Sequence, residues 1–467
     1  MRRHAVACAA VLLAAVILVP SAVAQGFSVY EHDACTMARG TTGVAAPCSG
    51  GSAVFFNPAG ILGSATTFNL EGNLTLIAPT GNYTDSASRV KTDLVNHTFP
   101  VPAGYATYQI SPTFAAGVGV YAPYGLTTDW PTTSPGRYLA YKTSIASIYV
   151  QPTIAWAPVP QLQIGGGPVY VHSSAQVHRR IDASTTGIPG TPLTLASLGV
   201  PTGTDFADAD FDVSGNGWGF HVGAIFKATD KLSLGVRYLS QVKINYTGTA
   251  SFTQVPTGLT LAAGNPFGLP GGTPLDLVLA AAFDPDSVLA SRGASTSITM
   301  PWQVVAGAAY KVMDNLTVLF DWQHTNWSSF NTLQLSVAAN AGTGGQPETI
   351  GSLESYGNTD AFRVGLDWQA TKTLAVRLGA LRHNGASPDQ SVTPLLPEGN
   401  RVEGTVGVGV KLLPQLRLDL GYQYLQQQDR RGRLIDPPAG TAPTPAMNTG
   451  IYSFKANLFS ASLALGL

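Results

Sequence analysis

The stretch Leu232-Ser233-Leu234-Gly235-Val236-Arg237-Tyr238 alternates apolar and polar residues strictly. Successive side chains of a β-strand point to opposite faces of the sheet, so this alternation predicts a strand with one apolar and one polar face. The same pattern recurs in five further stretches, at 220–227, 362–368, 375–381, 416–424 and 461–467. We therefore expect an all-β chain.

Charged residues of the predicted strands fall on one face. They are Arg237, Lys243, Asp321, Arg363, Asp367, Arg377, Arg417 and Asp419. The opposite face carries Leu, Val, Phe, Tyr and Trp. Such a face suits the lipid around a transmembrane barrel, whose lumen tolerates charge. It also suits the core of a soluble sandwich, so the periodicity alone leaves both architectures open.

The lengths of the connections separate the two architectures. We predict fourteen strands, at 67–77, 103–110, 113–121, 142–156, 161–178, 216–227, 231–247, 299–312, 316–337, 356–369, 373–384, 401–412, 416–429 and 449–467. Short turns alternate with long loops through every connection, which is the habit of outer-membrane barrels and has no reason to occur in a sandwich. Residues 67–467 are therefore predicted to form a 14-stranded antiparallel transmembrane β-barrel.

The N-terminus predicts export. Arg2 and Arg3 precede an apolar core at 6–19, and Ala22-Val23-Ala24 provides a small-x-small cleavage site. These are the parts of a secretory signal peptide, assigned to residues 1–24. A membrane anchor fits less well, because the core is short and no stop-transfer pattern follows. The mature chain has no apolar run of 18 residues, so we expect it to cross a membrane only as a closed barrel.

Composition excludes several other classes of protein. Only 11% of the 467 residues are charged, against about 25% in soluble domains. The formal net charge of −1 lacks the basic footprint of a nucleic-acid binder, so no nucleic-acid partner is expected. Low charge without a low-complexity tract also argues against disorder.

Residues 25–66 match no strand pattern and are rich in Gly and Ala. They contain Cys35 and Cys48, which an oxidising compartment would join in a disulfide, although two unrelated thiols are the alternative. A segment this short does not form a domain alone. We expect it to fold inside the lumen as a plug, or hatch, with a flexible periplasmic tail as the alternative.

Several short motifs follow one another along the chain. They are Asn57-Pro58-Ala59 within 52–60, and the stretches 118–125, 217–220, 322–330, 374–379 and 397–401. In this order they resemble the long-chain fatty acid transporter (FadL) family of outer-membrane proteins, which includes relatives that take up aromatic hydrocarbons. The resemblance covers essentially the whole mature chain. Asn400 departs from it by replacing an acid, and Leu467 by standing where such barrels end in an aromatic residue.

The resemblance implies a hatch-plugged barrel in the outer membrane that takes up hydrophobic molecules passively, either fatty acids or hydrocarbons. Outer loops would capture the ligand, a pocket beside the hatch would hold it, and it would leave sideways through a kinked third strand. The expected partners are outer-membrane lipids and the ligand, and we expect a monomer without a cofactor. A structural or adhesin-type barrel without transport is the alternative.

Four groups of residues are candidates for this function. The apolar residues Leu275, Leu279 and Phe283 follow Thr273-Pro274, a pair that opens helices, in the loop 248–298. If exposed, they would capture ligand; the alternative is that they pack against the loop 179–215. Asn57-Pro58-Ala59 should form a rigid, non-helical turn where the hatch meets the wall.

The other two groups lie in strands. Gly117 and Gly119 remove bulk in mid-strand and predict a bend with unpaired backbone, the putative lateral gate; an ordinary small-residue strand is the alternative. Arg237, Arg363 and Arg377 point inward and could meet a carboxylate bidentately. The alternative is that they form ion pairs with lumen aspartates.

No catalytic or metal site is predicted. The mature histidines occur in none of the HExxH, CxxC or GxSxG motifs. His172 and His178 share one face of a strand but lie about 20 Å apart, which is too far for one metal ion. An enzyme is therefore not expected.

Overall fold

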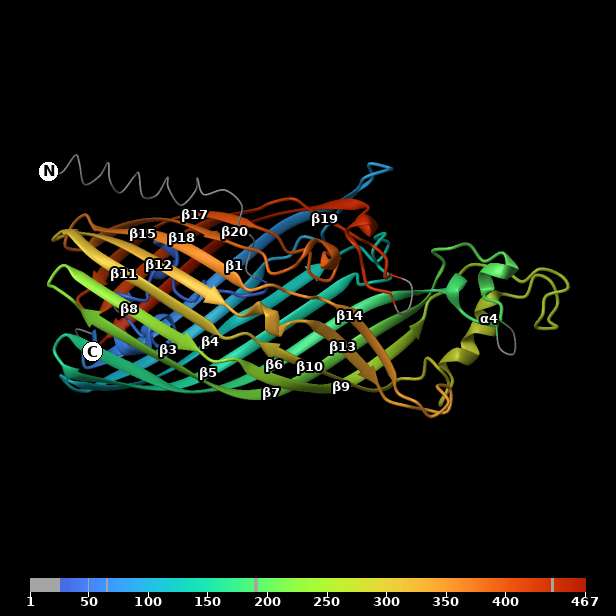
Figure 1. The fold of residues 1–467 in the computed structure, drawn as a ribbon, viewed down its shortest axis with the longest axis horizontal. Helices are drawn as coiled ribbons and strands as arrows, with labels where there is room; N and C mark the ends of the chain where they lie inside the picture. The colour runs from blue at the N-terminus through green and yellow to red at the C-terminus, as the bar shows by residue number, and fades with distance from the viewer. Residues whose placement is uncertain (1–25, 49, 64–65, 189–191, 438–440) are drawn as a thin grey trace.

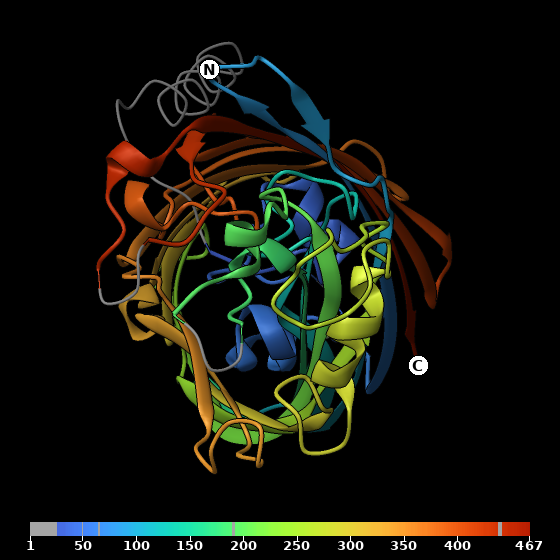
Figure 2. The same ribbon diagram turned by 90° about the vertical axis from the view of Figure 1, so that its right-hand side faces the viewer.

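The computed structural model describes the chain apart from residues 1–25, 49, 64–65, 189–191 and 438–440, so the predicted signal peptide lies outside the described residues. The strands form one antiparallel sheet that closes on itself. Closure occurs at β1 (Phe68–Asp85), which pairs with β3 (Phe99–Ser111) on one side and with β20 (Gly450–Gly466) on the other. Figure 2 shows the resulting ring from the end that carries the long loops, here called the outer end.

The wall has fourteen strands, four of which are interrupted and carry two labels each. In order they are β1, β3, β4 (Phe114–Asp129), β5 (Lys142–Val159), β6 (Leu162–Asp182), β7 (Asp205–Lys227), β8 (Leu232–Leu239) with β9 (Val242–Gln254), β10 (Arg292–Met300) with β11 (Gln303–Met313), β12 (Leu316–Thr325) with β13 (Thr332–Val337), β14 (Glu348–Leu353) with β15 (Thr359–Gln369), β16 (Leu374–His383), β17 (Arg401–Leu413), β18 (Leu416–Gln427) and β20. The short strands β2 (Lys91–Asp93) and β19 (Arg430–Gly432) extend the sheet beside β1 and β20.

The predicted fourteen-stranded antiparallel barrel is thus confirmed. Several strands are longer at the outer end than predicted; β7, for example, begins at Asp205 rather than at residue 216. The part of β7 that was not predicted alternates as well, with Asp208, Asp210 and Asp212 on one face and the buried Ala209, Phe211 and Val213 on the other, so its pattern is that of a strand.

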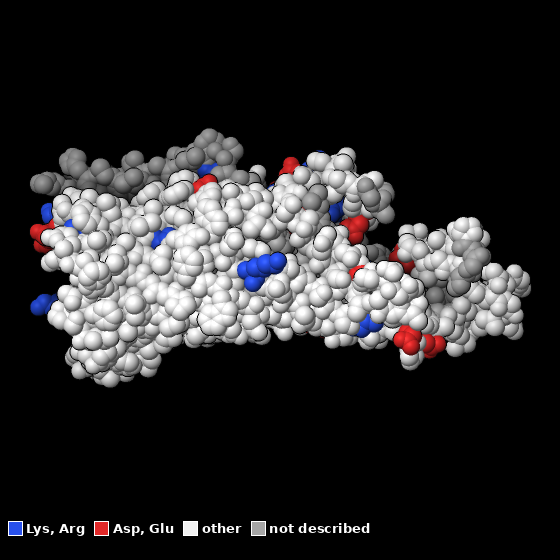
Figure 3. Space-filling view, turned by 60° about the horizontal axis from the view of Figure 1, so that its bottom comes forward, with Lys and Arg blue, Asp and Glu red and all other residues white. Residues whose placement is uncertain are grey.

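Side chains of the wall alternate between lumen and lipid as expected. The lumen-facing Arg237, Asp321 and Arg363 are almost fully buried. Figure 3 shows that the middle of the barrel's outer surface is largely uncharged on the side in view. Lys243 is an exception, because it was expected in the lumen and is instead exposed. The strand is interrupted between β8 and β9, and the interruption shifts the following side chains to the opposite face.

The N-terminal segment, residues 26–63, lies within the ring of strands (Figure 2). It contains α2 (Ala34–Ala38), α3 (Ala53–Phe56) and the 3-10 helix η1 (Pro58–Gly63), and most of its described residues are buried. Asp33 caps α2 by accepting the backbone N–H groups of Cys35 and Thr36. Cys35 and Cys48 form the predicted disulfide, with a Cα–Cα distance of 6.3 Å.

The wall receives this segment at glycines. A Cβ atom on Gly223 would lie 2.1 Å from the Asn57 Oδ1 atom, and one on Gly379 would lie 2.0 Å from the Gly40 backbone nitrogen. Any larger residue at these positions would push the segment away from the wall. Glycine is required here for close approach rather than for an unusual backbone conformation.

Outer loops form a small head beyond the barrel (Figure 1). It contains η2 (Ala183–Thr185), η3 (Leu195–Leu198), α4 (Leu275–Leu279) and η4 (Ala280–Phe283). Three further 3-10 turns, η5 (Trp327–Ser329), η6 (Asp389–Ser391) and η7 (Pro445–Met447), lie in other loops. In the described part of the chain, no helix is long and apolar enough to span a membrane.

Candidate functional site

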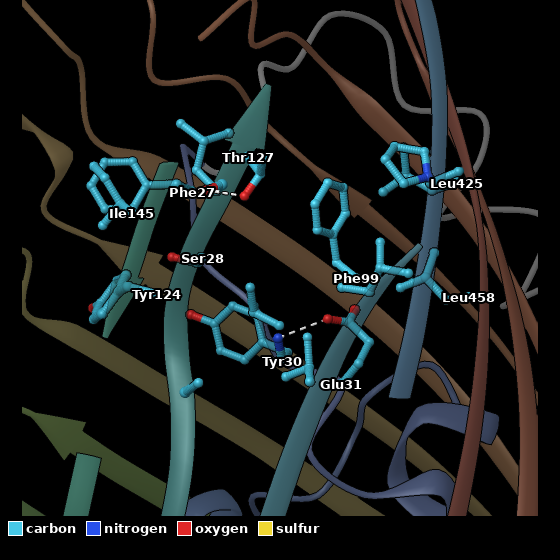
Figure 4. Close-up of a pocket in the computed structure, with 18 of the residues that line it drawn as sticks. Phe27, Ser28, Tyr30, Glu31, Phe99, Tyr124, Thr127, Ile145, Leu425 and Leu458 are labelled. Carbon is cyan, nitrogen blue, oxygen red and sulfur yellow. Dashed lines mark hydrogen bonds between the residues drawn. The ribbon is translucent and has the colours of Figure 1, made fainter. Parts of the chain in front are cut away.

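A cavity of about 560 Å³ lies between the N-terminal segment and the barrel wall. Its lining comes from both ends of the chain, as Figure 4 shows for Phe27 and Tyr30 of the segment, Phe99 of β3, Tyr124 of β4 and Leu458 of β20. Most of the lining is aromatic or aliphatic. A cavity of this size and polarity suits a small hydrophobic molecule.

The wall beside this cavity is incomplete. The hydrogen-bonded ladder between β3 and β4 ends at Gly104 and Val120. Beyond that point β3 continues along β1 as far as Phe99, whereas β4 continues along β5 to Asp129. The two strands therefore separate towards the outer end. At the same level, the pairing between β4 and β5 shifts register between Tyr121 and Tyr124.

The N-terminal segment pairs with β4 where β3 has left it. The backbone N–H of Val29 donates to the Pro123 carbonyl at 2.9 Å, and the N–H of Gly125 donates to the Phe27 carbonyl at 3.0 Å. Ser28 and Tyr124 form the antiparallel bridge between these bonds. The segment thus satisfies backbone groups that lipid could not satisfy.

The cavity reaches both sides of the wall at this gap. Tyr30 and Glu31 line it from the lumen. Val120 and Ile148 also line it, and they are 43% and 48% exposed on the lipid-facing surface of β4 and β5. The same cavity therefore borders the lumen and the membrane.

The predicted gate glycines lie just below the gap. Gly117 and Gly119 pair with β3 through Thr107 and Tyr105, and both also pair with β5. The expectation of unpaired backbone at these glycines is wrong, because β4 leaves the ladder only after Val120. Tyr121 and the residues after it no longer pair with β3, which is the arrangement that was expected of the glycines. They belong to the stretch 118–125, whose residues Ala122-Pro123 lie where the register with β5 shifts.

One end of the cavity is polar. Its lining includes Glu31, His383, Glu398, Arg401 and Glu403. Glu398 accepts the backbone N–H groups of residues 26, 386 and 387, and Glu31 accepts that of residue 30. The side-chain amide of residue 423 donates to both Glu31 and Glu403. Sequence reasoning missed these residues, although Glu398 and Arg401 lie in the stretch 397–401.

The three predicted arginines face the lumen, but none lines this cavity. Arg377 forms ion pairs with Asp367 and Asp419, at 3.2 and 2.8 Å, which confirms the alternative for this residue. Arg237 lies over the ring of Phe55 and Arg363 over the ring of Tyr30, at 4.8 and 4.5 Å. Both form cation–π contacts with the N-terminal segment. Their contact with a ligand remains a prediction.

Asn57 joins the N-terminal segment to the wall. Its side-chain amide donates to the carbonyls of Val44, Ala224 and Val236, and its Oδ1 atom accepts the N–H of Ala59. Its backbone is extended, as expected before a proline. The expectation of a non-helical turn is wrong from the next residue onward, since Pro58 begins η1.

The predicted capture residues do not form an exposed surface. Leu275 and Leu279 are buried in the core of the head, where they pack with Leu195 and Phe206. Phe283 is partly buried and contacts the ring of Phe206 edge to face. The loops 179–215 and 248–298 cover each other's apolar faces, as the alternative hypothesis for these residues stated.

A second cavity, of about 100 Å³, adjoins the first towards the outer end. Ser144 and Ile145 line both cavities, and Phe211 and Leu333 add to the apolar lining of the second. Asp436, in an outer loop, also borders it. Burial raises the pKa of this carboxyl group, while Arg433 and Arg179 oppose that effect.

Comparisons with known proteins agree with this architecture. A family model described as "Outer membrane protein transport protein (OMPP1/FadL/TodX)" matches residues 15–464. The long-chain fatty acid transport protein of Escherichia coli O6:H1 (strain CFT073) is 22% identical over 433 residues, which is 90% of this chain and 91% of that protein.

Solved structures show the same fold. A crystal structure of a Pseudomonas aeruginosa FadL homologue has a TM-score of 0.76 at 20% identity and covers 95% of this chain and 100% of its own. The Pseudomonas putida toluene transporter TodX has a TM-score of 0.69 at 15% identity, with 94% and 99% covered. The protein thus belongs to the OMPP1/FadL/TodX family of outer-membrane transport proteins and is a fourteen-stranded barrel of the outer membrane.

Proposed function

We propose that this protein carries hydrophobic molecules passively across the outer membrane and releases them sideways between β3 and β4. The observation that carries the proposal is the 560 Å³ cavity, which borders both the lumen and the lipid-facing side of the wall. A solute in it would move from protein to lipid without crossing water. Such a path avoids the cost of exposing apolar surface twice.

In this proposal, residues 25–66 act as the hatch. Asp321 of the wall accepts the backbone N–H groups of Gly43 and Val44, and Asn57 bonds to the carbonyls of β7 and β8. These buried bonds hold the segment across the lumen and would keep ions from passing. The intact protein should therefore show no large, stable conductance in planar-bilayer recordings.

Solute would enter at the outer loops and pass through the smaller cavity beside Ile145 to the larger one. The protein would need only outer-membrane lipids and its ligand as partners, and it would act as a monomer without catalysis. The names of the relatives suggest fatty acids and toluene-like hydrocarbons as ligand classes.

A structural or adhesin-type barrel is the alternative function. Such a barrel does not require an apolar cavity that opens towards lipid. Uptake of a radiolabelled fatty acid and a radiolabelled aromatic hydrocarbon by a deletion strain, with and without this chain, separates the two. Transport is supported if the strain that expresses the chain takes up either solute faster than the deletion strain does. The structural barrel is supported if the two strains take up each solute at the same rate.

A further inference from the structure

Lys243 is a charged residue on the lipid-facing surface of the barrel. The interruption between β8 and β9 turns its side chain outwards, and the side chain is exposed. Among the described residues it forms no ion pair. A charge that faces lipid is costly at the midplane of a membrane, and this cost falls steeply towards the interfaces. The depth of Lys243 in the membrane therefore decides what it can bind.

Aromatic residues indicate this depth. On β7, the exposed Phe226 and Trp218 are eight positions apart, which is about 26 Å along the strand. Outer-membrane barrels carry an apolar band about 25 Å tall between two girdles of aromatic residues. Phe226 is next to the end of β7 at a short turn, so Trp218 marks the outer girdle. Trp218 is 69% exposed, and its ring lies 5.0 Å from the ring of Tyr170. A side chain level with Trp218 is therefore at the outer surface of the membrane.

A row of exposed polar side chains crosses four strands just outside this girdle. Its members come from β6, β7, β9 and β10, and each pairs directly with the next: His172, Asn216, Asn245 and Ser297. Lys243 lies two residues from Asn245 on the same face of β9. Trp218 has the equivalent position beside Asn216 on β7. Lys243 is thus level with the outer girdle and adjoins the polar row.

The hydrogen bonds within this row leave its donors free. The Oδ1 atom of Asn216 accepts a hydrogen bond from the Tyr170 hydroxyl at 2.8 Å. The Oδ1 atom of Asn245 accepts one from the Ser297 hydroxyl at 3.1 Å. Among the described residues, neither amide nitrogen donates a hydrogen bond. The two amide groups and the ammonium group of Lys243 are neighbours that can only donate, so an anion with several acceptor oxygens would complement them.

We propose that Lys243, Asn216 and Asn245 bind the phosphorylated sugar head group of a glycolipid of the outer leaflet, the lipopolysaccharide class. This lipid is the main component of that leaflet, and its phosphates lie at the interface where Lys243 is placed. A phosphate group supplies the negative charge and the acceptor oxygens, and a lysine at such a surface adds to the affinity for anionic lipid. The site lies on β7 and β9, away from the gap between β3 and β4, so the proposal goes beyond the proposed function and does not depend on it.

Native mass spectrometry of the detergent-solubilised protein tests the proposal. The protein is titrated with bisphosphorylated lipid A, with dephosphorylated lipid A and with phosphatidylglycerol, and the wild type should bind the first most tightly. Lys243→Met should weaken the binding of bisphosphorylated lipid A about fivefold, which is the effect of one lysine near an anionic lipid surface. Dephosphorylated lipid A should bind this variant and the wild type equally. Asn216→Leu should also weaken the binding of bisphosphorylated lipid A, because it removes a donor and keeps the charge.

Lys227→Met is the matched control, because Lys227 is exposed at the opposite end of β7. It should bind all three lipids as the wild type does, and the heat-modifiable mobility of each variant verifies that the barrel is folded. The proposal is overturned by an unchanged affinity in Lys243→Met, or by an equal loss in Lys227→Met. It is also overturned if Lys243→Met loses affinity for dephosphorylated lipid A to the same extent. Binding of phosphatidylglycerol as tight as that of bisphosphorylated lipid A would assign the site to a phospholipid instead.

Discussion

Val29 donates its backbone N–H to the carbonyl oxygen of Pro123 at 2.9 Å, so that the N-terminal segment replaces β3 as the neighbour of β4. This bond lies where the cavity, the N-terminal segment and the lipid-facing surface of β4 meet. Movement of the segment and opening of the wall would therefore be coupled.

Replacing Val29 by proline should loosen this contact, because proline has no N–H to donate. The loss of one hydrogen bond is worth about 1 kcal/mol, which corresponds to about fivefold faster hydrogen exchange at the neighbouring amide of Gly125. Exchange measured by mass spectrometry of the peptide containing Gly125 checks this. Val29→Ala keeps the N–H and should exchange as the wild type does; identical rates in both variants would contradict the coupling.

The role of Gly119 can be tested by a valine substitution. A Cβ atom at Gly119 would lie 2.9 Å from both Val54 of the segment and Tyr105 of β3. Overpacking of this kind costs about 1–3 kcal/mol, and it would displace the segment just below the gap. We expect slower solute uptake with a normal amount of folded barrel.

Gly104→Val is the control for this substitution, because a Cβ atom at Gly104 would have no neighbour within 4 Å. Gly104 lies at the last pair of the same ladder. Transport by Gly119→Val at the wild-type rate would contradict a role of this glycine in the gate. It would support the alternative hypothesis that Gly117 and Gly119 belong to an ordinary small-residue strand.

The disulfide should stabilise the N-terminal segment rather than the barrel. It closes a loop with a sequence separation of 13, for which the chain-entropy model gives about 3 kcal/mol. In the double variant Cys35→Ser, Cys48→Ser we expect faster proteolysis within residues 26–63 and unchanged resistance of the strands. Alkylation of both cysteines in the unreduced wild-type protein would contradict the disulfide itself.

The sequence predicts the barrel well because two independent signals agree. Side-chain alternation marks each strand inside the membrane, and turn lengths fix the order of the connections. The pattern failed at Lys243, where an interrupted strand changes face, and at Leu275, whose apolar helix packs into the head instead of facing solvent. Neither an interruption of the ladder nor the partner of an apolar loop can be read from local periodicity.

The cavity was harder to predict than the fold. The sequence identified the stretch that contains Ala122-Pro123, but the gap depends on where β3 and β4 cease to pair, which is a relation between two strands. Arg401 and His383 are 18 positions apart in sequence, and they meet only because β16 and β17 are neighbours in the wall. Arg377 faces inward as expected, but its ion pairs with Asp367 and Asp419 depend on neighbouring strands in the same way.

Sideways release through the gap above Val120 is tested most directly by a single substitution in β4. Ala122 lines the cavity at the gap, whereas Ala116 lies on the same strand where the ladder with β3 is intact. Uptake of radiolabelled dodecanoate by a deletion strain expressing Ala122→Trp is compared with uptake in a strain expressing Ala116→Trp, at equal amounts of heat-modifiable protein. We predict that Ala122→Trp lowers uptake to near the level of the deletion strain, because the indole fills the exit, and that Ala116→Trp transports as the wild type does. Wild-type uptake in the Ala122→Trp strain would contradict sideways release and would favour passage straight through the lumen.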